Sequence, residues 1–209
     1  MRGESMKVRQ YKVLSVVLIV FVVLSCHIYV DANTATPLLN LGRKWYDTPV
    51  DVYFNCDFDT DERNAVSAAM DKWNSVKDPD GNSIVTMHLT DGLAFNYVQY
   101  GYLSGNAVGY CELRPTSGEE ISAVTVYLND SCNWSTTGDL DAYDIQTVVM
   151  HELGHALGIA HCHESSEGDG PCWSATCLDN IMNPSTSLGD VNYTFQPYDT
   201  ASYMMIYYW

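Results

Sequence analysis

Alternating apolar and polar residues predict a series of short strands in the chain. Between residues 50 and 54, Val50, Val52 and Phe54 are apolar and would lie on one side of a half-buried strand. Further apolar runs, separated by Gly, Asp and Ser, predict strands at residues 84–89, 95–100, 108–111 and 124–128. The pattern therefore indicates a sheet whose strands are short and joined by turn-forming residues.

Two other segments have apolar residues at the spacing of a helix face. In the first, the buried face consists of Ala65, Ala69, Met70 and Trp73, and Asp59 or Thr60 can cap the helix. The second is predicted to begin near Asp141, and its buried side consists of Ile145, Val149, Leu153 and Ala156. Helices interspersed with strands predict a mixed α/β (α+β) fold built on one twisted sheet.

The first 32 residues have the pattern of a secretory signal peptide. Basic residues precede an apolar run at 13–24, and the sequence becomes polar from Asp31 onward. Cleavage before Asn33 would leave residues 33–209 as a single domain. Two alternatives stay open. Cys26 follows a stretch similar to a bacterial lipobox and could be lipidated. Residues 13–30, a stretch of 18 residues, are also near the lower limit of about 17 to 25 residues for a membrane-spanning anchor.

The charge balance restricts the partners of the chain. It has 26 acidic residues against 10 Lys and Arg, which gives a formal net charge of -16. Such a surface disfavours nucleic acids and anionic membranes, so membrane contact is expected only through an uncleaved leader or a lipid anchor. We expect a secreted, extracellular monomer, or one held at the cell surface by its leader. The acidic composition leaves calcium binding open.

The most informative segment is H-E-x-x-H-x-x-G-x-x-H, which spans residues 151–161. On a helix, His151 and His155 lie one turn apart on the same face and can bind one metal ion. Gly158 can adopt a left-handed conformation that ends the helix and brings in His161 as third ligand. Three protein ligands leave one position of a catalytic zinc open for water. An amphipathic helix with incidental histidines is the competing interpretation, and Gly158 and His161 make it weak.

Glu152 stands beside the first ligand, where its carboxylate can reach a zinc-bound water without binding the metal. This is the position of a general base, which accepts the proton of the water and later delivers it to the leaving amine. The segment therefore predicts a hydrolase with one catalytic zinc.

The long motif resembles that of the metzincin metallopeptidases, which also carry a methionine turn beneath the zinc. Ile181-Met182-Asn183-Pro184 looks like that turn, and its form is closest to the matrixins, the matrix metalloproteinase type. The resemblance extends to residues 45–55 as first strand, 61–74 as first helix and 196–208 as closing helix. It implies a metzincin-like fold in residues 33–209, with Met182 as a hydrophobic floor. Cys162 replaces the Ser that matrixins usually have after the third histidine.

The resemblance also implies a substrate site. The counterpart of the edge strand that pairs with extended substrate is residues 107–112, which include Val108, Gly109 and Tyr110. The pocket beside the zinc would be walled by residues 184–197. The candidates there are Pro184, Tyr193 and Tyr198.

Six cysteines follow the leader, an even number that suggests up to three disulfides in an exported protein. Proximity in sequence suggests Cys111 with Cys132, and one pairing among Cys162, Cys172 and Cys177. A thiolate ligand is the less favoured alternative, because three histidines already complete the metal site.

Together these features predict a secreted zinc-dependent endopeptidase that hydrolyses extended protein or peptide substrates. Two alternatives are carried forward: a zinc hydrolase that acts on small amides, and a zinc-containing binding module without turnover. The intact Glu152 argues against the binding module, since metal binding alone does not require it.

Overall fold

The computed structural model describes residues 41–114, 118–162 and 179–208, all within one compact unit, Thr36–Trp209. The predicted signal peptide lies outside the described residues. The elements are β1 (Val50–Asn55), α2 (Thr60–Asn74), β2 (Val85–Leu89), β3 (Asn96–Gly101), β4 (Gly109–Arg114), β5 (Ala123–Asn129), β6 (Trp134–Ser135), β7 (Tyr143–Asp144), α3 (Ile145–Ala156) and α4 (Pro197–Tyr208). No helix in the described ranges has the length and apolar character needed to cross a membrane.

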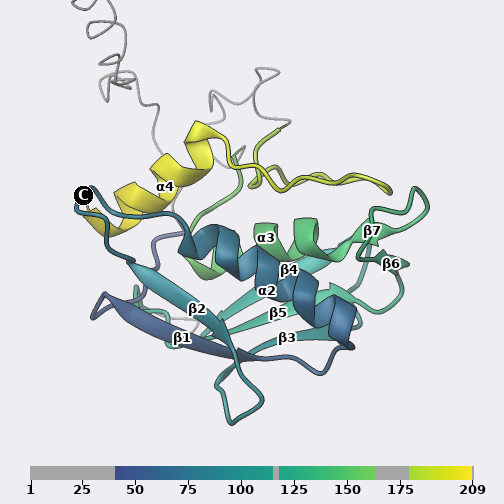
Figure 1. Ribbon diagram of the computed structural model, residues 1–209, viewed down its shortest axis with the longest axis horizontal. Coiled ribbons are helices and arrows are strands. Elements are labelled where there is room, and N and C mark those ends of the chain that lie inside the picture. Colours follow the sequence, from purple (N-terminus) through teal and green to yellow (C-terminus); the bar gives the residue numbers. More distant parts are fainter. Residues whose placement is uncertain (1–40, 115–117, 163–178, 209) are drawn as a thin grey trace, which may run out of the picture. The chain divides into compact units, whose positions relative to one another are not determined.

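The five long strands form one sheet in the order β2-β1-β3-β5-β4. Neighbouring strands are parallel except for β4, which runs antiparallel to β5 at the edge. Helices α2 and α3 pack on one face of this sheet (Figure 1). The mixed fold predicted from the sequence is thereby confirmed. The segment that was expected to be an edge strand, residues 107–112, overlaps β4, which is at one edge of the sheet.

The core lies between the sheet and the two helices because each element contributes one apolar face. Phe54, Val98, Val126 and Leu128 are fully buried on the sheet, opposite the α2 and α3 residues Val66, Trp73, Val149 and Leu153. This burial fixes the orientation of α3, so that its remaining side is available for a site.

Helix α3 begins at Ile145, later than the start predicted near Asp141. Asp144 is its N-cap: the Asp144 carboxylate accepts the Thr147 N–H at 2.7 Å. Residues 143–144 pair with residues 134–135 as the small β6–β7 ladder, so they are extended and cannot continue the helix backward. At α2, Asp59 is the cap, in a capping box with Glu62.

The expected Cys111–Cys132 disulfide is not formed, because both thiols are free. Cys111 is opposite Val126 within the β4–β5 ladder, whereas Cys132 lies in the turn after Asn129. The three residue steps from Val126 to Asn129 alone span roughly 10 Å. That exceeds the Cα separation of about 7 Å at which a disulfide can form. The pairing expected around Cys162 involves residues outside the described ranges.

Candidate metal centre

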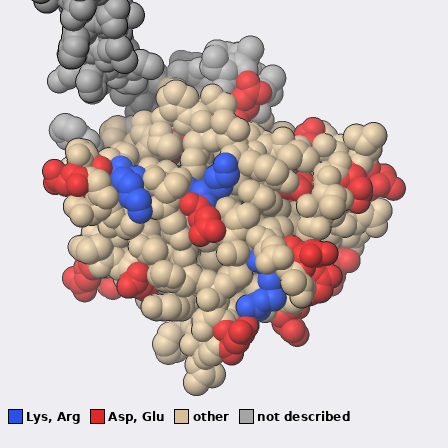
Figure 2. Space-filling view, in the orientation of Figure 1, with Lys and Arg blue, Asp and Glu red and all other residues tan. Residues whose placement is uncertain are grey.

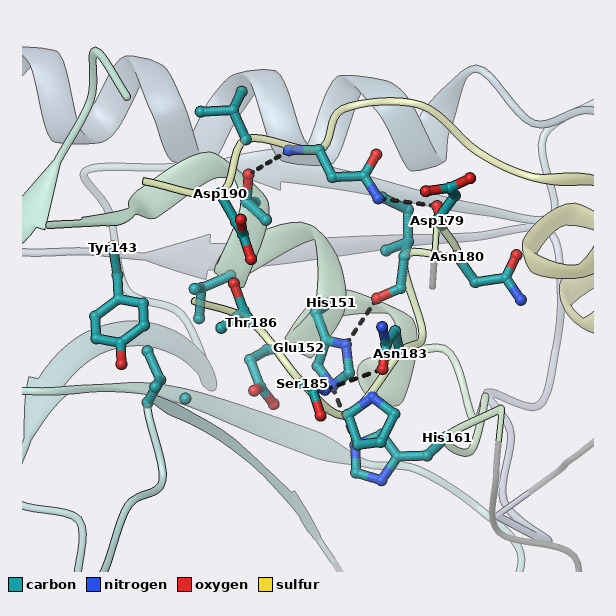
Figure 3. Close-up of a pocket in the computed structure, with 18 of the residues that line it drawn as sticks. Tyr143, His151, Glu152, His161, Asp179, Asn180, Asn183, Ser185, Thr186 and Asp190 are labelled. Carbon is teal, nitrogen blue, oxygen red and sulfur yellow. Dashed lines mark hydrogen bonds between the residues drawn. The ribbon is translucent and has the colours of Figure 1, made fainter. Parts of the chain in front are cut away.

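Three histidine side chains, those of His151, His155 and His161, converge at the end of α3. Figure 3 shows two of them, His151 and His161, next to each other. His151 and His155 project from the same side of α3, and the chain then turns at Gly158, whose φ of 87° is left-handed. The turn brings His161 back, so that its Nε2 lies 3.1 Å from Nε2 of His151 and 3.0 Å from Nε2 of His155. The spacing predicted from the sequence does bring these three residues together.

Hydrogen bonds determine which nitrogen of each helical histidine faces the centre. Nδ1 of His151 donates to Ile181 O at 2.8 Å, and Nδ1 of His155 donates to Ile159 O at 2.7 Å. A carbonyl oxygen can only accept, so each ring carries its proton on Nδ1 and directs an Nε2 lone pair at the other ligands. Burial, followed by the neighbouring charge of His155, lowers the pKa of His151 to about 3, which keeps this ring neutral.

A cation between the three Nε2 atoms would be bound by such lone pairs, and zinc fits this donor set. Zinc accepts neutral imidazole nitrogens at about 2.0–2.1 Å, which places two ligands of a tetrahedral ion roughly 3.3 Å apart. The separations of His161 Nε2 from the other two Nε2 atoms, 3.1 and 3.0 Å, are close to this value, and all three ligand atoms lie within 4.8 Å of one another. His151, His155 and His161 are the residues that would hold the metal.

Glu152 lies beside the three histidines and is nearly inaccessible, with 5% of its surface exposed. Burial raises the pKa of its carboxyl group to about 8. The backbone of Gly109 in β4 packs directly against it: a Cβ atom at position 109 would lie 2.5 Å from Oε1 of Glu152. The edge strand and the candidate base are therefore in contact, which requires a residue without a side chain at position 109.

Met182 lies beneath the catalytic helix and is 2% exposed. It packs so closely on Gly154 that a Cβ atom there would collide with the Met182 sulfur and approach Trp73. Met182 thus packs against the turn of α3 that lies between His151 and His155. Gly154 therefore has a packing role in addition to its place within the motif.

The turn that carries Met182 is held by a residue that the sequence analysis did not identify. Asp199 in α4 is 2% exposed, and its carboxylate accepts main-chain N–H groups of Ile181, Met182 and Gln196 at 3.2, 3.3 and 2.8 Å. Since Ile181 O in turn accepts from His151, Asp199 fixes the turn that orients this ring. An acidic residue in a predicted helix gives no sequence signal of such burial.

A cleft of about 1030 Å³ opens in front of the histidines. Of the predicted substrate residues, Val108, Gly109 and Pro184 line it. Tyr110 does not: it is 54% exposed and its ring stacks on Tyr127. Tyr193 donates its hydroxyl proton to Asp144 at 2.8 Å and thus supports the start of α3, and Tyr198 is also outside the cleft lining.

The cleft lining also contains polar residues that the sequence pattern did not single out. Thr147 in the first turn of α3 accepts the N–H of Asn192 at 3.0 Å through its hydroxyl oxygen, and the Asn192 amide donates to Asp179 O at 2.9 Å. Asp179 and Asp190 also line the cleft, and none of its described lining residues is Lys or Arg. Acidic side chains are likewise spread over the face shown in Figure 2, with only a few basic ones between them.

Comparison with known families agrees with this geometry. The family model described as Matrixin matches residues 55–168, just over half of the 209-residue chain and including the whole histidine motif. No curated protein matches the chain.

Proposed function

This chain belongs to the matrixin family, a family of zinc metallopeptidases, and from that premise we propose that it is a secreted zinc-dependent endopeptidase. Its substrates are extended segments of proteins or peptides. The observation that carries the proposal is the convergence of three Nε2 atoms next to a buried carboxyl group, within a cleft that is bordered by a sheet edge.

Glu152 is proposed as the general base and acid. When bound, zinc supplies a Lewis acid that polarises a carbonyl group and lowers the pKa of water to about 7. Glu152 accepts a proton from the attacking water and delivers it to the amine as the peptide bond breaks. Burial raises its pKa to about 8, close to neutral pH, so the carboxyl group can both take up and release a proton at little cost in free energy.

Strand addition to β4 is the proposed mode of substrate binding. Asn129 N–H donates to Val108 O at 2.9 Å, which shows that residue 108 pairs toward β5. In an antiparallel ladder the pairing direction alternates, so the main-chain groups of Gly109, Cys111 and Leu113 point outward. They offer donors and acceptors to an extended peptide without reading its side chains, and the pocket beyond Pro184 then sets side-chain preference.

Digestion of casein and of a peptide library, with and without a metal chelator, tests the proposal. We expect chelator-sensitive cleavage by the purified chain carrying one zinc. Glu152→Ala should lose at least about 100-fold in kcat while its zinc content stays at one per chain. A matched control is Glu112→Ala, since Glu112 is on β4 but its carboxylate interacts with Tyr127 at 3.4 Å. The control should keep its activity.

Three outcomes would overturn the proposal or part of it. Retained hydrolysis by metal-replete Glu152→Ala would contradict the role of this residue. A chain with one zinc that cleaves no extended peptide would be a binding module, and cleavage confined to small amides would indicate an amidohydrolase. Zinc content far below one per chain would contradict the metal site itself.

Secretion is proposed from the leader and is tested separately. Expression in a host with a secretory pathway, followed by N-terminal sequencing of the exported protein, should find a chain that starts at Asn33. A lipid on Cys26 or an intact membrane-bound leader would support one of the anchored forms instead.

A further inference from the structure

Three consecutive carbonyl groups at the C-terminal end of α3 are bound by distant parts of the chain. Ala156 O accepts the indole N–H of Trp45 at 2.9 Å, and Leu157 O accepts the hydroxyl of Tyr207 at 3.2 Å. Gly158 O accepts the N–H of Leu41 at 2.9 Å. The last carbonyls of a helix have no partner within it, and these bonds supply partners for the carbonyls at and just after the end of α3.

Two of the three donors belong to the segment of residues 41–46, which we call the N-terminal strap. The strap is held on its other side by residues 119–121: Lys44 N–H donates to Glu119 O at 2.8 Å, and Ile121 N–H donates to Lys44 O at 2.9 Å. A bond from Tyr46 to the Glu119 carboxylate, at 2.8 Å, extends this contact. The strap is therefore fixed to the domain and spans the end of the catalytic helix.

Contact between the strap and the turn is close. The carbonyl oxygen of Arg43 occupies the space into which a Cβ atom at Gly158 would project. Gly158 thus meets two separate requirements, its left-handed φ of 87° and the approach of the strap. Tyr207 links the strap to the turn: its hydroxyl oxygen accepts the main-chain N–H of Trp45 at 3.3 Å, and its hydroxyl proton is donated to Leu157 O.

This turn leads directly to the metal ligands. Residue 159 follows the three bound carbonyls, and its own carbonyl accepts the Nδ1 proton of His155. His161 comes two residues later. A shift of residues 156–158 would therefore rotate one ligand and displace another, although no strap residue reaches the metal.

We propose that the N-terminal strap is a positioning element of the zinc site, with Trp45 as its principal positioning residue and Tyr207 as its partner in α4. The proposal rests on the zinc site proposed above. Partners that orient metal ligands typically contribute 10–100-fold to metal affinity, and the strap acts through the carbonyls of the turn.

The test compares zinc release from two pairs of variants of the full chain. Trp45→Phe removes the indole donor to Ala156, and its control is Trp134→Phe, which removes an equally long, part-buried bond to Asn129 O. Tyr207→Phe removes the hydroxyl between strap and turn, and its control is Tyr208→Phe, which removes a surface bond to Asp78. The rate of zinc transfer to a chromogenic chelator is measured at fixed pH.

We expect zinc release to be about 10-fold faster in Trp45→Phe and in Tyr207→Phe, and within about twofold of the parent in both controls. The absorption spectrum of the Co²⁺-substituted chain should change in the same two variants only. Thermal unfolding of the metal-free forms verifies folding, and a similar loss of Tm in Trp45→Phe and Trp134→Phe would show that stability alone does not explain the difference. Release at the parent rate from both strap variants would overturn the proposal while the zinc site stands. Absence of zinc from the parent chain would instead contradict the proposed function.

Discussion

The two edges of the five-stranded sheet differ in whether other parts of the chain bond to their outward main-chain groups. At the β2 edge, the side-chain amide of Asn74 accepts Met87 N–H and donates to Met87 O, both at 2.8 Å, and Tyr203 accepts Val85 N–H at 3.0 Å. At the β4 edge, no described residue bonds to the outward main-chain groups, and the edge borders the cleft that contains the histidines.

The covered edge is protected against unwanted pairing, and the open edge is available to bind substrate. An exposed strand edge is a template for unwanted pairing, which proteins prevent by covering it. Here α2 and α4 supply side chains that satisfy β2, while β4 keeps its hydrogen-bonding groups available beside Glu152. An open edge next to a metal centre is the arrangement that strand addition of a substrate requires.

Removing the cover of the closed edge should have the largest effect on stability. Asn74→Ala leaves both main-chain groups of Met87 without partners, and we expect it to lower the free energy of unfolding by about 1–3 kcal/mol. Urea denaturation measures the change. Asn55→Ala, which removes one exposed bond to Gly92 O, is the matched control and should cost less. Equal losses in the two variants would show that the cover of β2 contributes nothing special.

The open edge can be tested from the substrate side. N-methylation of a cleaved peptide at alternate residues, those whose N–H groups would donate to β4 carbonyls, should lower kcat/KM by roughly threefold to tenfold for each lost bond. Methylation of the intervening residues, whose N–H groups point away, serves as control. A loss that does not alternate along the peptide would be incompatible with strand addition.

Helix α4 supports both the covered β2 edge, through Tyr203, and the turn that carries Met182, through Asp199. Burial, the largest influence, raises the pKa of Asp199 above its ordinary value, and the three main-chain N–H groups act in the opposite direction. The folded chain thus holds this proton more tightly than the unfolded chain. The resulting stabilisation is complete below the ordinary Asp pKa of about 4 and is lost as pH rises through the folded-state pKa.

Urea denaturation of the parent and of Asp199→Asn across that range isolates this contribution, since the variant lacks the titrating group. The parent should lose stability relative to Asp199→Asn as pH rises. A difference that moved the other way would mean that the hydrogen bonds, rather than burial, dominate at Asp199.

The smallest expected effect is electrostatic. Because the chain carries a formal charge of -16 and the described cleft lining has Asp179 and Asp190 without Lys or Arg, cationic peptides should be attracted to it. A lysine-flanked peptide should be cleaved a few-fold faster than its glutamate-flanked analogue at low ionic strength, and added salt should reduce the ratio. A ratio insensitive to salt would rule out long-range steering.

The features that the sequence predicted well depend on local spacing. Strand alternation and helix periodicity are properties of a few neighbouring residues, and so is the placement of His151 and His155 one helical turn apart. His161 lies only six residues after His155, with the turn residue Gly158 between them, so its position is also predictable from local sequence. For this reason the mixed fold was predicted correctly, and so was the grouping of the three histidines.

What the sequence did not predict depends on contacts between distant segments. Asp141 and Asp144 are both plausible helix caps, and the pairing of β7 with β6 decides between them. Tyr193 was expected in the pocket wall, yet its hydroxyl is bonded to Asp144. The supports of the metal centre, Trp45 and Asp199, have no sequence signal because their roles come from carbonyl and N–H groups elsewhere in the chain.

The most direct test of the account is a crystal structure of zinc-loaded Glu152→Ala with an uncleaved extended peptide. We predict a peptide that lies alongside β4, with main-chain hydrogen bonds to Gly109, Cys111 and Leu113, and that passes in front of the three histidines. A peptide bound along β2, or one held in the cleft without main-chain pairing to β4, would contradict the account.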